Sequence, residues 1–95
     1  MTQLGYWYSV YQPDLPHPTV NPQIDPTLRL RAVSWLNNGK LLNSYRGFST
    51  CRICGCVNGS IELGRDGYVY PEGLVHYITD HNVWLPEFDQ ILSAV

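Results

Sequence analysis

Four residues of this chain have side chains and spacing that suit a bound metal ion. Cys51 and Cys54 form a C-x2-C pair, and His76 and His81 follow 21 residues later as an H-x4-H pair. Two thiolates and two imidazoles are the ligand set of a closed tetrahedral zinc site. We therefore expect a structural Zn²⁺ ion held by these four residues.

The cysteine pair has the sequence of a zinc knuckle, a tight turn that points two sulfurs at one ion. Gly55 follows the second cysteine and relieves crowding there, and backbone amides in such a turn can donate to the sulfurs. Two alternatives stay open. Zinc could bind both cysteines, the third cysteine Cys56 and one histidine, or the chain could bind no metal and carry buried free thiols or a redox dithiol.

The histidine spacing sets a condition on the helix that carries the pair. Residues five apart lie about 140° around an ideal α-helix. The two ring nitrogens therefore converge only if the last turn of that helix loosens. His17, in the Asp14–Pro18 segment, is expected to be a loop histidine outside the site.

The first part of the chain must position these ligands without contributing to them. The aromatic and β-branched residues 6–11 favour a strand. Prolines at five positions between 13 and 26 then predict an extended arm that packs on the domain. Asp25 and Pro26 form an N-cap and first-turn pair, so we expect a helix over about 26–38. It should stop at Asn37-Asn38-Gly39, where Gly39 can take the left-handed conformation.

The second part carries the ligands and reads as a knuckle–hairpin–helix unit over about 46–82. A strand near 46–50 leads into Cys51, residues 60–63 and 67–70 read as a β-hairpin, and a helix opening at Pro71 carries the histidines. Asn82 is the expected C-cap. A short C-terminal helix starts near Pro86, with Phe88, Ile91 and Leu92 on its apolar face.

These elements make a small zinc-stapled α+β domain. Its 95 residues suit a single domain over 1–95, divided into the strand and arm (1–25), the helix and its connection (26–45) and the zinc-binding unit (46–95). The chain has no apolar run long enough for a membrane span and no signal-peptide pattern. We expect a cytoplasmic protein with no membrane partner, where reducing conditions favour metal over a disulfide.

Charge is unevenly distributed, although the total is only −2. All six basic residues fall between positions 29 and 65, where Glu62 is the one acid, and the chain from Asp66 onward has five acids and no Lys or Arg. A nucleic-acid-binding, zinc-finger-like protein using the basic segment is therefore the alternative function. It is not favoured, because about 12 residues separate the pairs of a common DNA-reading finger and the histidine helix here is acidic.

Catalysis is also disfavoured, because four good ligands would close the zinc shell and leave no position for water. A zinc-dependent hydrolase is the less favoured alternative. We expect a non-enzymatic protein-interaction or regulatory module whose partner is another protein of bacterial or phage origin. The candidate surface combines basic and aromatic residues: Arg29, Arg31, Arg46, Tyr45 and Trp84.

The chain resembles a group of small, uncharacterised bacterial proteins, most clearly from Arg46 onward. The similar residues are Arg46-Gly47, Cys51-x-x-Cys54-Gly55, Asn58-Gly59-Ser60, Pro71-Glu72-Gly73-Leu74-x-His76-Tyr77, His81, Val83, Leu85-Pro86 and Phe88. Tyr70 stands where tryptophan is expected in that group. The resemblance implies a shared zinc-knuckle fold and no particular function.

Overall fold

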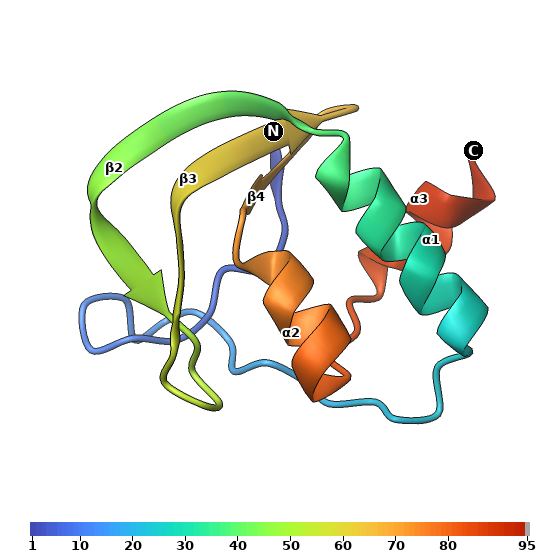
Figure 1. Cartoon of the computed structure of the whole chain (residues 1–95), viewed down its shortest axis with the longest axis horizontal. Coiled ribbons are helices and arrows are strands. Elements are labelled where there is room, and N and C mark those ends of the chain that lie inside the picture. The colour runs from blue at the N-terminus through green and yellow to red at the C-terminus, as the bar shows by residue number, and fades with distance from the viewer. Residues whose placement is uncertain (95) are drawn as a thin grey trace.

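The computed structural model describes residues 1–94, and within them one mixed sheet and three helices form an α+β fold, as expected (Figure 1). The sheet has the strand order β1-β4-β3-β2. Its strands are β1 (Thr2–Gln3), β2 (Lys40–Thr50), β3 (Val57–Arg65) and β4 (Tyr68–Pro71). The helices are α1 (Pro26–Asn37), α2 (Leu74–His81) and α3 (Glu87–Ser93).

Strand β2 is an edge strand that arches away from its neighbour β3, and it is longer than the predicted 46–50 segment. The antiparallel register pairs Ser44 with Ile61 but Ser49 with Gly59. The four residues Tyr45–Phe48 therefore lie opposite the single residue Ser60, as an irregular bulge in the ladder. We call these four residues the arch; they sit where β2 bends strongly in Figure 1.

Strands β3 and β4 form the predicted hairpin. Asp66 and Gly67 are its two loop residues, and both have left-handed backbone, with φ of 52° and 85°. This is the conformation that an Asp-Gly hairpin turn favours. β4 continues to Pro71, and the Glu72 N–H donates to the Ile61 carbonyl at 3.1 Å. The chain is thus still paired with β3 at the point where the second helix was predicted to open, and α2 starts later, at Leu74.

Helix α1 begins as predicted, but its C-terminus is not formed in the predicted way. The Asp25 side chain accepts the Thr27 N–H at 2.8 Å, a cap that contributes about 1 kcal/mol. The predicted left-handed Gly39 stop is wrong, because Gly39 is not among the residues with positive φ in the described chain. Its missing side chain serves close packing instead: a Cβ there would lie 2.0 Å from the Tyr70 hydroxyl oxygen.

The predicted strand at 6–11 is also wrong. The ladder to β4 is made by Thr2 and Gln3, and the chain turns away at Gly5, which has φ of 73°. Trp7 then packs edge-on against Tyr77, with ring centroids 5.7 Å apart, and leaves the sheet for the core. Tertiary packing of aromatic side chains has overridden their strand propensity.

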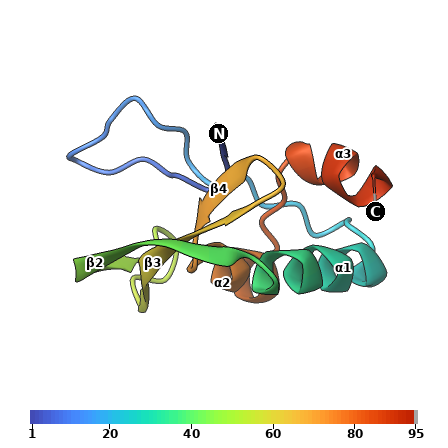
Figure 2. The same cartoon turned by 90° about the horizontal axis from the view of Figure 1, so that it is seen from above.

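The proline-rich arm packs along the molecule, as expected for a segment with apolar anchors. Val20 pairs with Val83, and the Asn21 N–H donates to the Asn82 carbonyl at 2.7 Å. Figure 2 shows residues 6–18 standing off the sheet beside β2 before the arm runs along α2 toward α1. The arm is therefore anchored to the residues that follow α2.

The core lies between the sheet and the helices and is centred on aromatic residues. The Tyr70 hydroxyl donates to the Leu36 carbonyl at 2.6 Å, and the Trp35 ring lies 5.7 Å from the Tyr70 ring. Helix α3 contributes Phe88, Ile91 and Leu92 to this core, which confirms its predicted apolar face. Cys51 is the one predicted metal ligand within the core cluster of the described chain.

Candidate metal centre

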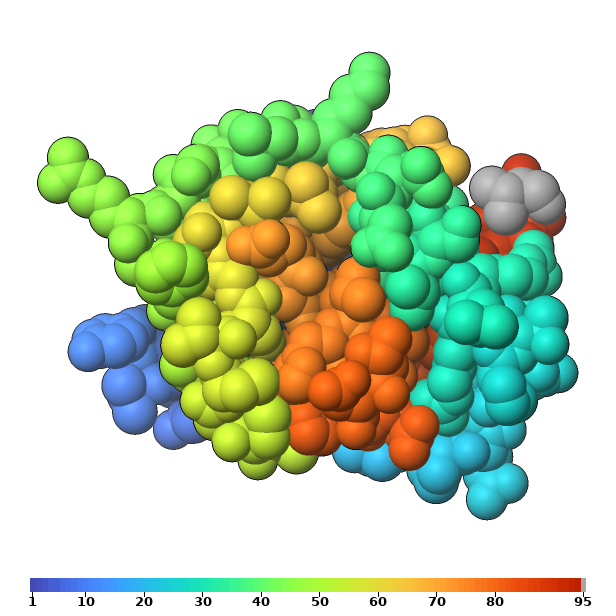
Figure 3. All heavy atoms as spheres, in the orientation of Figure 1, coloured from blue at the N-terminus to red at the C-terminus, as the bar shows by residue number. Residues whose placement is uncertain are grey.

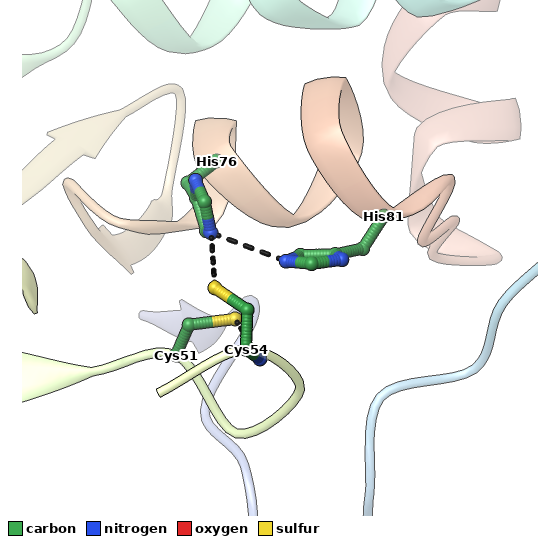
Figure 4. Close-up of side chains that lie close together, drawn as sticks. All are labelled: Cys51, Cys54, His76 and His81. Carbon is green, nitrogen blue, oxygen red and sulfur yellow. Dashed lines mark hydrogen bonds between the residues drawn. The ribbon is translucent and has the colours of Figure 1, made fainter. Parts of the chain in front are cut away.

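The structure brings Cys51, Cys54, His76 and His81 together. One ligand atom from each lies within 4.8 Å of the other three. The cysteines come from the turn between β2 and β3, and the histidines project from α2 toward them (Figure 4). Residues more than 20 positions apart in the sequence thus form one group that could bind a metal ion.

The spacing of the ligand atoms suits a single tetrahedral ion. His76 Nε2 lies 3.2 Å from His81 Nε2 and 3.4 Å from Cys54 Sγ. Zn–N bonds near 2.05 Å and Zn–S bonds near 2.3 Å imply about 3.3 Å between two nitrogens and about 3.6 Å between nitrogen and sulfur in a tetrahedron. The observed distances are close to both values.

Backbone hydrogen bonds fold the cysteine turn so that its sulfurs face inward. The Cys51 N–H donates to the Cys56 carbonyl at 2.8 Å, and the Gly55 N–H donates to the Cys51 carbonyl at 2.9 Å. Gly55 has φ of 78°, which its lack of a side chain permits. The N–H groups of Ile53 and Cys54 approach Cys51 Sγ at 3.4 and 3.5 Å. These contacts fix the direction in which Cys51 Sγ points.

The last turn of α2 is widened, which is the condition that the H-x4-H spacing requires. The Asn82 N–H bonds to the Tyr77 carbonyl, five residues back, and Asn82 is left-handed with φ of 56°. The Val83 N–H bonds to the same carbonyl at 3.1 Å. This wider turn brings the His81 ring toward His76, and it confirms Asn82 as the C-cap.

Asp80 also contacts the cluster, although it is not among the residues predicted for the site. Its Oδ2 lies 3.3 Å from His76 Nδ1, so the carboxylate faces the ring nitrogen that points away from the cluster. Such a contact fixes the ring orientation and leaves Nε2 free as a ligand. The signal was present in the sequence, because His76 and Asp80 are four residues apart and share one helix face.

Cys54 and Cys56 have opposite ionisation tendencies. Hydrogen bonds from the Cys56 backbone and thiol, and then from His76 and His81, lower the pKa of the Cys54 thiol to about 5. The pKa of Cys56 is raised, mainly by its hydrogen bond to Cys54. Their sulfurs are 3.3 Å apart, closer than the roughly 3.8 Å of two sulfurs on one tetrahedral zinc. Cys56 Sγ also lies 3.4 Å from His76 Nε2, but the group whose ligand atoms all lie within 4.8 Å of one another contains Cys54 and not Cys56.

The basic and aromatic residues expected at an interaction surface do not form one patch. Trp84 is only 8% exposed and packs against the core, so it is unavailable as a surface residue. Arg29 and Arg31 donate to main-chain carbonyls, those of Asn21 and Ile24 for the first and that of Leu92 for the second. Tyr45 and Arg46 are exposed on the arch of β2.

His17 lies outside the metal cluster, as expected. Its ring stacks on Tyr8 with centroids 4.6 Å apart.

Figure 3 shows the cysteine turn and β3 lying directly against α2, with the N-terminal arm visible beyond them. The two stretches that carry the four candidate ligands are thus neighbours on one face of the molecule.

No protein family, curated protein or solved structure matches this chain. Over residues 1–94, no helix has both the length and the apolar character needed to cross a bilayer.

Proposed function

We propose that this chain is a zinc-binding protein whose Cys2His2 site is structural, and that it acts as a non-enzymatic protein-interaction module. The observation that carries the proposal is the convergence of Cys51, Cys54, His76 and His81 to within 4.8 Å. Two sulfurs and two nitrogens match the preference of zinc for tetrahedral sites with soft and borderline ligands.

A structural role is supported by what the site would connect. The cysteine turn lies at the end of the arched β2–β3 pair, and both histidines lie on α2, which ends at His81. A bound ion would fix these two parts to each other, and it would do so beside the core through Cys51, which is 3% exposed. Small domains with limited cores commonly gain stability this way.

The nearby carboxylates support a non-enzymatic reading. Asp80 faces His76, and Glu72 Oε1 accepts the Ser60 N–H at 2.6 Å. Both groups near the ligands in sequence therefore have structural partners. A general base for a zinc-bound water would need a carboxylate directed at the open side of the ion.

An interaction role is supported by the exposed edge strand. All eleven residues of β2 are exposed, and they include Leu41, Leu42, Tyr45 and Phe48, with exposures from 41% to 69%. A long edge strand with apolar side chains can pair with another chain. The low charge of the whole chain fits a surface that a protein partner covers.

The nucleic-acid alternative gains less support. Four of the six basic side chains donate to main-chain carbonyls: Arg29, Arg31, Arg52 and Arg65. Phosphate binding depends on cations that are free to replace counterions. Lys40 and Arg46 remain on β2, which is a small basic footprint for a nucleic acid.

Metal analysis of purified protein tests the zinc site. We expect one zinc per chain in the wild type and in Cys56→Ser, and well under one in Cys54→Ser. The two variants are matched, because they remove the same atom from neighbouring exposed positions. Equal loss of zinc in both would place Cys56 among the ligands, and an unchanged melting temperature in chelator would contradict a structural role.

A capture experiment tests the interaction role. Wild-type protein and a Leu41→Lys/Phe48→Lys variant serve as parallel baits in lysate of the native host, with zinc content confirmed in each. We expect a stoichiometric protein that the wild type recovers and the variant does not. Recovery of the same proteins by both baits would exclude β2 as the interface.

A further inference from the structure

A second site lies outside the metal cluster, between the N-terminal arm and the curved β2–β3 pair. It is a cavity of about 550 Å³, within the range of about 300–1,000 Å³ typical of small-molecule pockets. Figure 2 shows the arm and β2 on either side of this region. Five of its lining residues are aromatic, among them Tyr6, Trp7, Tyr45 and Phe48. The other lining residues include several polar side chains, one acid, Glu62, and one base, Arg52.

Glu62 is the polar centre of this cavity. Its Oε2 accepts from the Tyr6 hydroxyl, and its Oε1 accepts from the Tyr45 hydroxyl at 2.5 Å and from Asn43 Nδ2 at 3.0 Å. A carboxylate has about four acceptor positions, so one remains free. The hydrogen bonds, first that from Tyr45 and then that from Tyr6, lower the pKa of Glu62 and keep it ionised at neutral pH.

The charge of Glu62 has no cationic partner within residues 1–94. The ion pairs of this part of the chain are Arg65 with Asp66 and His76 with Asp80. Arg52 also lines the cavity, but its guanidinium donates to the carbonyls of Tyr8 and Thr50. An ionised carboxylate among aromatic side chains attracts a cation, because ring faces and carboxylate both favour positive charge.

We propose that this cavity binds an organic cation, an ammonium or methylated ammonium group on an apolar body, with its charge at Glu62 and its apolar part against the aromatic walls. The cation is either a free amine or a lysine side chain of another protein. Binding here requires no role for the zinc site beyond folding, so the proposal stands apart from the structural function of that site.

The arch forms an exposed side of the cavity. Tyr45 and Phe48 are 54% and 69% exposed, although both line the cavity. Large aromatic side chains left this open gain area to bury when a ligand arrives. Gly47, between them, has no atom within 4 Å of the place where a side chain would begin, so nothing packs against the arch at that point.

Nuclear magnetic resonance titration of the zinc-loaded protein tests the proposal. Benzyltrimethylammonium represents a free amine, and a capped Ala-Ala-Lys-Ala-Ala peptide represents a protein lysine. Benzyl alcohol and the same peptide with norleucine are the uncharged controls. We expect one or both cations to shift the amide signals of the arch and of β3 around Glu62, and whichever binds more tightly identifies the source of the ligand.

Variants assign the binding to the carboxylate. Glu62→Gln keeps one acceptor oxygen and the side-chain size and removes the charge, and we expect affinity for the cation to fall about tenfold. Asp66→Asn removes the same charge at the hairpin turn, where asparagine also accepts positive φ, and should bind as the wild type does. Phe48→Ala, an exposed change, should weaken binding severalfold even if Glu62→Gln folds poorly.

Three results would overturn the proposal. The first is that the uncharged probes bind as tightly as the cations. The second is that neither cation shifts the signal of a cavity residue at millimolar concentration. The third is that Asp66→Asn loses as much affinity as Glu62→Gln. Zinc content and melting temperature, measured on the same samples, separate these outcomes from a failure of the metal site.

Discussion

At the scale of single residues, the candidate metal centre is contacted by groups that are not themselves candidate ligands. Asp80 faces His76 Nδ1, and the amides of Ile53 and Cys54 approach Cys51 Sγ. Partners of this kind set the orientation and charge of a ligand, and their loss weakens metal binding without removing a ligand atom.

The contact from Asp80 gives a specific expectation. Asp80→Asn should weaken zinc affinity by about 10–100-fold, because His76 loses the carboxylate that orients its ring. Competition with a chromophoric chelator measures the change. Asp89→Asn, an exposed residue on α3, is the matched control; equal affinities in the two variants would show that the Asp80 contact has no effect on the metal.

Glu62 should contribute stability that depends on pH. Its folded-state pKa is lowered by hydrogen bonds from Tyr45, Tyr6 and Asn43, so the contribution is complete above the ordinary value of 4.5 and is lost as pH falls through the lowered pKa. The urea midpoint of the wild type should therefore fall more steeply below pH 4.5 than that of Glu62→Gln. Parallel curves for the two proteins would contradict this expectation.

At the scale of elements, the end of α1 and the end of β4 are joined by close packing at Gly39. The Tyr70 hydroxyl, bonded to the Leu36 carbonyl, occupies the space that a larger residue 39 would need. This contact joins residues 31 positions apart, so no local pattern around Asn38 and Gly39 could have predicted it.

Gly39→Ala should therefore destabilise the fold by about 1–3 kcal/mol, which is the usual effect of overpacking. Gly47→Ala is the matched control, because its added carbon meets nothing within 4 Å, and it should change stability little. Urea unfolding measures both. If the Tyr70 hydroxyl is the obstacle, Tyr70→Phe should lower the free energy of unfolding less in the Gly39→Ala protein than in the wild type.

Local sequence signals predicted most of the helices and strands, but fewer of the residues at which they begin and end. Asp25-Pro26, Asp66-Gly67 and Asn82 act by short-range chemistry, and the structure has a cap or turn at each. The prediction of a strand at 6–11 failed because Trp7 packs against Tyr77. The helix expected at Pro71 starts later because Pro71 is still paired with β3. Both errors come from contacts between distant parts of the chain.

The candidate site was predictable in part for a related reason. The four ligand types and their spacing are visible in the sequence, and the structure brings them together. The burial of Trp84 and the cavity around Glu62 were not visible, because each depends on how the arm, α3 and the arched strand pack. The isolated acid in a basic segment was the one signal that pointed to Glu62.

At the scale of the whole molecule, the metal site lies at the margin of the core. Fifteen of the sixteen buried core residues in the described chain are not candidate ligands, and Cys51 is the exception. Loss of zinc should therefore loosen the cysteine turn and the end of α2 first. The packing of α1 on Tyr70 does not pass through the site.

Hydrogen exchange with and without chelator tests this separation. We expect faster exchange in residues 51–60 and 76–84 of the zinc-free protein, with amides of Ala32–Leu36 still protected, because local opening follows local contacts. The melting temperature should fall at the same time. Uniform loss of protection across the chain would mean that the metal holds the whole fold and not one margin of it.

The arch of β2 also affects how the sequence of such a protein can change in evolution. Pairing on either side of Tyr45–Phe48 is fixed independently, by Ser44 with Ile61 and by Ser49 with Gly59. Residues can therefore be inserted or exchanged between these anchor points while the ladder and the cysteine turn keep their places. The arch is a natural position for diversification, and for grafting a recognition sequence onto this scaffold.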